Sequence, residues 1–86
     1  MIMVSGLAKI TSGPFFYTDS GKGYGADLIV EFAKGKTLQL ISPNYIMTEC
    51  LQPLQTGHSV RFEGYLDSED PGLYIVKLTA IRRSKR

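Results

Sequence analysis

The chain has 86 residues, of which 43% are hydrophobic and 21% charged, and its formal net charge is +2. This is enough for one small hydrophobic core, and it excludes a second domain, a large active-site cleft and a disordered chain. One cysteine excludes an internal disulfide, and one cysteine with one histidine excludes a four-ligand zinc site made of thiolate and imidazole donors. No apolar run approaches the ~20 residues of a membrane span, and the first six residues lack the pattern of a signal peptide. We therefore expect a cytoplasmic protein that does not contact a membrane.

The positive charge is concentrated at the C-terminal end of the sequence. Four of the ten basic side chains lie in the last five positions, so the first 81 residues carry six basic and eight acidic side chains. Net charge alone is therefore weak support for a polyanionic partner, and the position of each basic residue is the more informative feature.

Alternation of apolar and polar residues predicts a mainly β protein. The first predicted strand covers 2–10, with Ile2, Val4, Ala8 and Ile10 on one face, and it ends at the turn-forming residues 11–14. The stretch 15–25 is predicted to be a loop because glycines recur at its positions 21, 23 and 25.

A hairpin follows this loop, and then the only predicted helix. Strands over 27–32 and 37–42 are joined by a turn at 34–36. The helix is predicted to begin at Ser42 and Pro43 and to be limited to two or three turns by Pro53. Its apolar stripe comprises Ile46, Met47, Cys50, Leu51 and Leu54. Two further strands are predicted over 60–66 and 74–80.

This order of elements is that of the OB-fold, a five-stranded Greek-key barrel with a helix between its third and fourth strands. We therefore predict an all-β fold with one OB-fold domain over 1–81. The residues 82–86 are predicted to form a basic, flexible C-terminal tail. A chain of this size is marginally stable alone, so a homodimer or a higher homo-oligomer is expected.

Two stretches resemble a known family. The segment 54–66, Leu-Gln-Thr-Gly-His-Ser-Val-Arg-Phe-Glu-Gly-Tyr-Leu, resembles the helix end and fourth strand of bacterial single-stranded-DNA-binding proteins, and 18–22, Thr-Asp-Ser-Gly-Lys, resembles their first loop. The chain departs from that family in having no tryptophan, and no long linker with an acidic tip is expected after the barrel. It is more similar to short relatives such as primosomal replication proteins and phage or plasmid binding proteins. The resemblance implies non-catalytic binding of single-stranded DNA with little sequence preference, in replication, restart, recombination or repair, alongside replication or recombination proteins.

The candidate binding residues are aromatic side chains interleaved with basic ones. Aromatic rings stack on any base, and ammonium or guanidinium groups follow the phosphates, which is the pattern of sequence-tolerant single-strand binding. The stacking candidates are Phe15, Phe16, Tyr17 and Tyr24, and Tyr65 is a candidate for continuing the path. The phosphate candidates are Lys9, Lys22, Lys34, Lys36, Arg61, Arg82, Arg83, Lys85 and Arg86.

Each of these features also has a structural interpretation, and other functions stay open. The three adjacent aromatics could close the barrel end or a dimer seam, and the lysines of 34–36 could belong to a solvated turn. One alternative is an OB-fold protein–protein interaction subunit of a larger complex. A second is a cold-shock-like RNA-binding domain, because 22–25, Lys-Gly-Tyr-Gly, matches the opening of an RNA-binding motif that 26–28 then breaks. Cys50 and His58 lack an identifiable orienting group, so no catalytic residue, metal or cofactor is expected.

Overall fold

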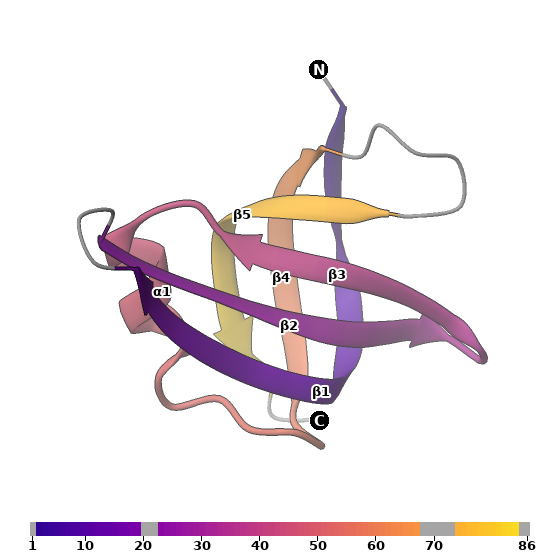
Figure 1. The fold of residues 1–86 in the computed structure, drawn as a ribbon. Coiled ribbons are helices and arrows are strands. Elements are labelled where there is room, and N and C mark those ends of the chain that lie inside the picture. The colour runs from indigo at the N-terminus through magenta and orange to yellow at the C-terminus, as the bar shows by residue number, and fades with distance from the viewer. Residues whose placement is uncertain (1, 20–22, 68–73, 85–86) are drawn as a thin grey trace.

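The computed structural model describes residues 2–19, 23–67 and 74–84, with the backbone alone described at 18, 19, 23 and 24. Five strands and one helix follow one another in the predicted order (Figure 1). They are β1 (Met3–Asp19), β2 (Gly23–Ala33), β3 (Lys36–Ser42), α1 (Tyr45–Leu51), β4 (Ser59–Leu66) and β5 (Ile75–Arg83).

The strands form a closed barrel in the order β1-β2-β3-β5-β4, and β4 pairs back onto β1. The β3–β5 pair is parallel and every other pair is antiparallel. Because β5 inserts between β3 and β4, the chain crosses over the barrel end after β3, and α1 lies in that crossover. This topology confirms the predicted OB-fold.

β1 is longer than predicted because it bends instead of ending at 11–14. Its first part, Met3–Lys9, pairs with β4, and its second part, Lys9–Asp19, pairs with β2. Two register shifts and the left-handed backbone of Gly13 (φ 93°) take up the turn-forming residues within the strand. The prediction of a loop over 15–25 was therefore wrong at both ends, since most of that stretch is paired strand.

The loop after α1 holds this bend in place. The Gly57 N–H donates to the Ile10 carbonyl at 2.8 Å, and the Thr56 hydroxyl donates to the Gly13 carbonyl at 2.8 Å. The two halves of β1 are thereby fixed on two different faces of the barrel.

Alternate residues of each strand point into the barrel and form the core. Phe62 on β4 is the largest of the fully buried side chains, and it belongs to one core cluster with aliphatic residues of every other strand. The core also includes Ile10, Leu28, Val30, Leu40, Val60, Val76 and Leu78. The outward positions of the same strands are thereby left for binding.

The helix begins two residues later than predicted. Asn44, not Ser42, is its N-cap, and its side chain accepts a hydrogen bond from the Met47 N–H at 2.9 Å. Ser42 instead ends β3, and its hydroxyl lies 2.6 Å from that of Thr48. The apolar stripe was only partly correct, because Ile46 is 73% exposed and Cys50 is exposed, whereas Met47, Leu51 and Leu54 are buried.

β5 extends two residues beyond the predicted end of the barrel domain at 81. Arg82 pairs with Arg61 and Arg83 pairs with Val60, so both arginines are part of the sheet. The first two residues assigned to a flexible tail are therefore fixed by strand pairing, while Lys85 and Arg86 lie outside the described residues.

Candidate functional site

Two predicted stacking residues lie side by side on the outer face of the β1–β2 pair. Phe15 pairs with Asp27 and Tyr17 pairs with Gly25, and both aromatic side chains point away from the core. Phe15 is 54% exposed and Tyr17 is 51% exposed, which is far more than stable burial of such large rings would leave. The Tyr17 ring covers Gly25, where a side chain would overlap it. Glycine at 25 therefore lets the ring lie flat against the strand.

The third aromatic of the run points to the other side. Phe16 pairs with Ala26, which is fully buried, so Phe16 extends from the inner face of the same strand pair and is still 44% exposed. The structure thus brings Phe15 and Tyr17 together and separates Phe16 from them. Alternation along a strand, which the loop interpretation of 15–25 left out, is the signal that would have shown this.

The face continues from these aromatics across β2 and β3. We call the outward side chains Phe15, Tyr17, Asp27, Ile29, Gln39 and Ile41 the aromatic face. Ile29 is exposed at its centre, and the Gln39 side-chain amide donates to Asp27 Oδ2 at 3.3 Å. Ile29 and Gln39 were not predicted as site residues, although both occupy outward positions of correctly predicted strands.

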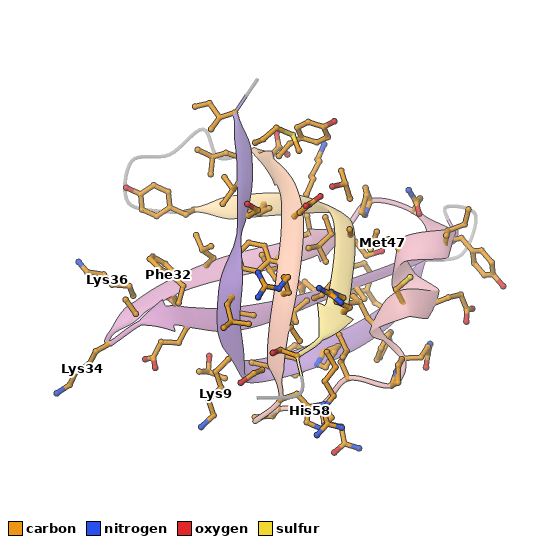
Figure 2. The ribbon with its side chains drawn as sticks, turned by 180° about the vertical axis from the view of Figure 1, so that it is seen from behind. Lys9, Phe32, Lys34, Lys36, Met47 and His58 are labelled. Atoms are coloured by element: carbon orange, nitrogen blue, oxygen red, sulfur yellow. The ribbon has the colours of Figure 1, made fainter. Side chains whose placement is uncertain are left out.

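Lys34 and Lys36 lie at the far end of this face, at the tip of the β2–β3 hairpin (Figure 2). Gly35 between them has a φ of 73°, and its N–H donates to Glu31 Oε2 at 3.3 Å. Both lysines are exposed and point away from the barrel. Seven residues of strand separate Asp27 from Lys34, which corresponds to about 23 Å. The aromatics and Lys34 are therefore at opposite ends of one surface, whereas Lys36 alternates with the outward Thr37 and lines an apolar groove on the other face of the hairpin.

Lys9 occupies the place where β1 passes between two faces of the barrel. It pairs with Glu31 of β2 on one side and with Ser59 of β4 on the other, and its side chain is exposed. Lys9 therefore adjoins the aromatic face without belonging to its centre.

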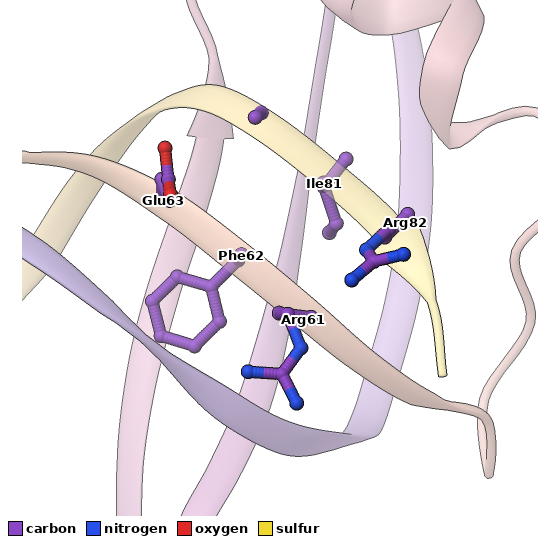
Figure 3. A pocket seen from close by; sticks show the side chains of 6 residues that line it. Arg61, Phe62, Glu63, Ile81 and Arg82 are labelled. Carbon is purple, nitrogen blue, oxygen red and sulfur yellow. The ribbon is translucent and has the colours of Figure 1, made fainter. Parts of the chain in front are cut away.

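The predicted arginines lie on a different surface, formed by β4, β5 and the first part of β1. Arg61 and Arg82 are direct neighbours across β4 and β5 (Figure 3). Because Val60 and Phe62 are buried, Tyr65 shares the outer side of β4 with Arg61, as predicted, and Glu63 lies between them. Figures 1 and 2, viewed from opposite sides, show β2 with β3 on one side of the barrel and β4 with β5 on the other. Arg61, Arg82 and Tyr65 therefore do not surround the aromatics.

An apolar groove opens where the first part of β1 diverges from the β2–β3 hairpin. Its volume is about 840 Å³, and Leu7, Phe32, Leu38 and Tyr74 are among its lining residues. Lys36 stands at its edge as the one charged lining residue described. No local sequence pattern predicts this groove, since its sides come from strands far apart in the chain.

The remaining candidates lie outside the described part of the chain. Lys22, Lys85 and Arg86 are not described, and of Tyr24 only the backbone is, in β2 opposite Thr18. Among the described residues, no group of three or more histidine, cysteine, aspartate or glutamate side chains could hold a metal ion. No helix in the described ranges is long and apolar enough to cross a membrane.

Comparison with known proteins shows the fold through solved structures. No protein-family model matches the chain, and no curated protein sequence matches it. The SSB domain of a protein from Synechococcus sp. superposes with a TM-score of 0.79 at 17% identity, covering 94% of this chain and 93% of that one. A small single-stranded DNA-binding protein from Streptomyces coelicolor has a TM-score of 0.78 at 13% identity, covering 98% and 93%. The protein priB from Ralstonia solanacearum has a TM-score of 0.76 at 8% identity, covering 98% and 99%.

Proposed function

We propose that this chain is a non-catalytic, cytoplasmic protein that binds single-stranded DNA with little sequence preference, in replication, restart, recombination or repair. The observation that carries the proposal is the exposed pair Phe15 and Tyr17 on the outer face of β1–β2–β3. OB-fold barrels bind oligonucleotides on the face of their second and third strands, next to the loops that flank it. The names of the structural neighbours, two of which are single-stranded-DNA-binding proteins, support the same class of ligand.

The chemistry of the aromatic face favours stacking over base-specific hydrogen bonding. Phe15, Tyr17 and Ile29 offer apolar surface to any base, whereas the polar pair Gln39 and Asp27 is already engaged in a mutual hydrogen bond. Stacking on an aromatic ring contributes ~1–3 kcal/mol per base irrespective of sequence. The protein would thus hold an unpaired strand extended and keep it from pairing or from nuclease attack.

Basic residues at the edges of the face would supply the phosphate contacts. Lys34 and Lys36 stand at one end and Lys9 along one side. An extended DNA strand needs only a few nucleotides to span the roughly 23 Å from the aromatics to the hairpin tip, which is at the lower end of the ~4–16 nucleotides that one OB barrel covers.

The test is a fluorescence-anisotropy titration of labelled oligo-dT, oligo-U and duplex DNA at two salt concentrations. We expect oligo-dT to bind more tightly than duplex and the affinity to fall as salt rises. Absence of binding to any single strand near 50 mM salt would contradict the proposal and favour the protein-interaction module. A clear preference for oligo-U would favour the RNA-binding alternative.

We also propose that two copies of the chain associate through the apolar groove. Residues 3–8 of β1 pair with β4 on one edge, and no described strand pairs with the other edge. Such an edge accepts another strand, and the groove beside it exposes Leu7, Phe32 and Tyr74. A second copy can supply both the strand and the apolar cover.

Light scattering of the purified protein tests this association. Phe32→Asp should shift the mass toward the monomer, because a carboxylate would be buried in the interface. The matched control is Ile46→Asp, at an exposed apolar position on α1 outside the groove. A monomeric wild type, or equal effects of the two substitutions, would contradict it.

A further inference from the structure

Two arginines face each other across β4 and β5, and within the described residues neither takes part in an ion pair. Arg61 and Arg82 are register partners, and both side chains are exposed on the outer side of the sheet (Figure 3). Like charges directly opposite each other on adjacent strands destabilise the pair. Strand pairing holds the two backbones at this separation, so repulsion cannot be relieved by moving the chain.

Within the described residues, no carboxylate neutralises this pair. Glu63 lies two positions from Arg61 on the same strand and pairs with Ala80, and no ion pair joins it to either arginine. The ion pair found in the described ranges joins Lys77 to Asp67 at 3.3 Å, elsewhere on the same sheet. The two guanidinium groups therefore have unused donors directed at solvent.

The surface around the pair is hollowed. A depression of about 210 Å³ is lined by Arg61, Arg82, Arg83 and Ser84. At this end of β5, the Ser84 N–H donates a hydrogen bond to the Ser59 carbonyl at 2.7 Å, which fixes the backbone beside the depression. Leu7 pairs with Arg61 from the other side and is exposed, so an apolar side chain borders the charged one.

We propose that Arg61 and Arg82 form a phosphodiester-binding site for the same nucleic-acid strand, on the side of the barrel away from the aromatic face. Two guanidinium groups on register-paired residues can both donate N–H hydrogen bonds to one phosphate, whose negative charge removes their repulsion. This inference rests on the proposed function and extends it, since it makes the bound strand continue around the barrel instead of ending on one face.

Lys9 connects the two surfaces. Its backbone pairs with both β2 and β4, so its exposed ammonium group lies at the boundary between the aromatic face and the Arg61–Arg82 side (Figure 2). A DNA strand that runs from Phe15 along β1 therefore meets Lys9 before it reaches Arg61. Arg61 and Arg82, which lie away from the aromatic face, thus mark where the bound DNA strand continues around the barrel.

Oligonucleotides of two lengths test this path in the full chain. We expect Arg61→Ala/Arg82→Ala to bind an oligo-dT of about 5 nucleotides as wild type does, because such a strand stays on the aromatic face. For an oligo-dT of about 16 nucleotides, the slope of log affinity against log salt should be smaller by about 0.7, since the two arginines share one phosphate and each lost phosphate contact removes ~0.7. Raising salt fourfold would then cost wild type about 2.6-fold more affinity than the variant.

Two controls separate charge from fold. Arg61→Lys/Arg82→Lys keeps both charges and should restore most of the slope without the paired hydrogen bonds. Glu63→Gln, on the same face, should not reduce the slope. An unchanged slope with the long oligonucleotide, or an equal change with the short one, would overturn the proposed site.

Inorganic pyrophosphate provides a readout independent of DNA. The Nε–Hε NMR signals of Arg61 and Arg82 should shift on its addition. Oligonucleotide binding with neither this shift nor a slope change would refute the second site and leave the proposed function standing. A pyrophosphate shift without any oligonucleotide binding would refute the proposed function and with it the strand path, and would leave only an anion site.

Discussion

Tyr17 shows how a single outward position links sequence to function. It alternates with the inward Phe16, its ring covers Gly25, and half of its surface is still exposed. The glycine that made the sequence resemble a loop instead makes room for the ring. All three adjacent aromatics are exposed, but their division between two sides required the register of β1 against β2.

Replacing Tyr17 with alanine should weaken binding of oligo-dT without changing its salt dependence. The loss of one stacking platform costs ~1–3 kcal/mol, which corresponds to roughly 5- to 150-fold in affinity. Anisotropy at several salt concentrations measures both quantities. Tyr45→Ala, which removes an exposed tyrosine from α1, is the control and should leave affinity unchanged. A drop in salt slope for the Tyr17 variant would mean that the ring orders phosphate contacts and not bases.

Gly64, in the segment 54–66 that resembles single-stranded-DNA-binding proteins, has a role in packing and not in binding. The register of β4 against β5 shifts between Glu63 and Gly64, and a side chain at 64 would collide with the Lys77 carbonyl oxygen and the Val76 side chain. The backbone oxygen cannot move aside without breaking the sheet.

Gly64→Ala should therefore destabilise the fold by ~1–3 kcal/mol or more, as overpacking of a filled site does. Gly6→Ala is the matched control, since its Cβ would make only ordinary contacts of 3.8 Å with the Phe62 ring. Urea unfolding of both variants measures the difference. Equal midpoints would show that β5 can shift to accept the methyl group.

At the level of elements, alternation located the five strands but not where they end. The turn-forming residues 11–14 predicted a strand end, yet the barrel uses them as a bend, because register shifts and Gly13 absorb them while pairing changes from β4 to β2. In the same way, β5 continues through Arg83 because β4 offers partners as far as Val60. Strand length in a closed barrel depends on the neighbouring strands, which the local sequence does not contain.

The β2–β3 hairpin tip is the element whose contribution to binding is easiest to isolate. Lys34 and Lys36 are exposed and distant from the core, so their removal should not alter stability. Lys34→Ala/Lys36→Ala should reduce the salt slope for a 16-nucleotide oligo-dT by about 1.4 if both contact phosphate. Salt-dependent anisotropy, with thermal unfolding to confirm the fold, measures this. A solvated turn without a role in binding would leave the slope as in wild type.

On the scale of the whole molecule, the closed barrel places on two surfaces the aromatic and basic residues that the sequence suggested as one site. Aromatic and basic residues were predicted as site residues from their types, and of those whose side chains the structure describes all but the half-buried Tyr65 are exposed. Their division between the aromatic face and the Arg61–Arg82 side follows from β5 inserting between β3 and β4. The apolar groove leaves no local signal, because its sides come from strands far apart in the chain, so it could not be predicted from the sequence.

The net charge of +2 says less about binding than the positions of the basic residues do. The described basic residues are distributed over the hairpin tip, the bend of β1 and the β4–β5 surface. Arg82 and Arg83 belong to the sheet, so they cannot act as a loose tail. The central claim is therefore that the aromatic face binds the bases of the DNA strand. Basic side chains around the barrel contact its phosphates.

The most direct test is an NMR titration of the isotope-labelled protein with an oligo-dT of about 8 nucleotides, following every backbone amide. We expect the largest shifts on residues 15–17 of β1, 25–29 of β2 and 39–41 of β3, with little change in α1. Saturating oligonucleotide that shifts no amide, or shifts confined to α1 and the apolar groove, would contradict it.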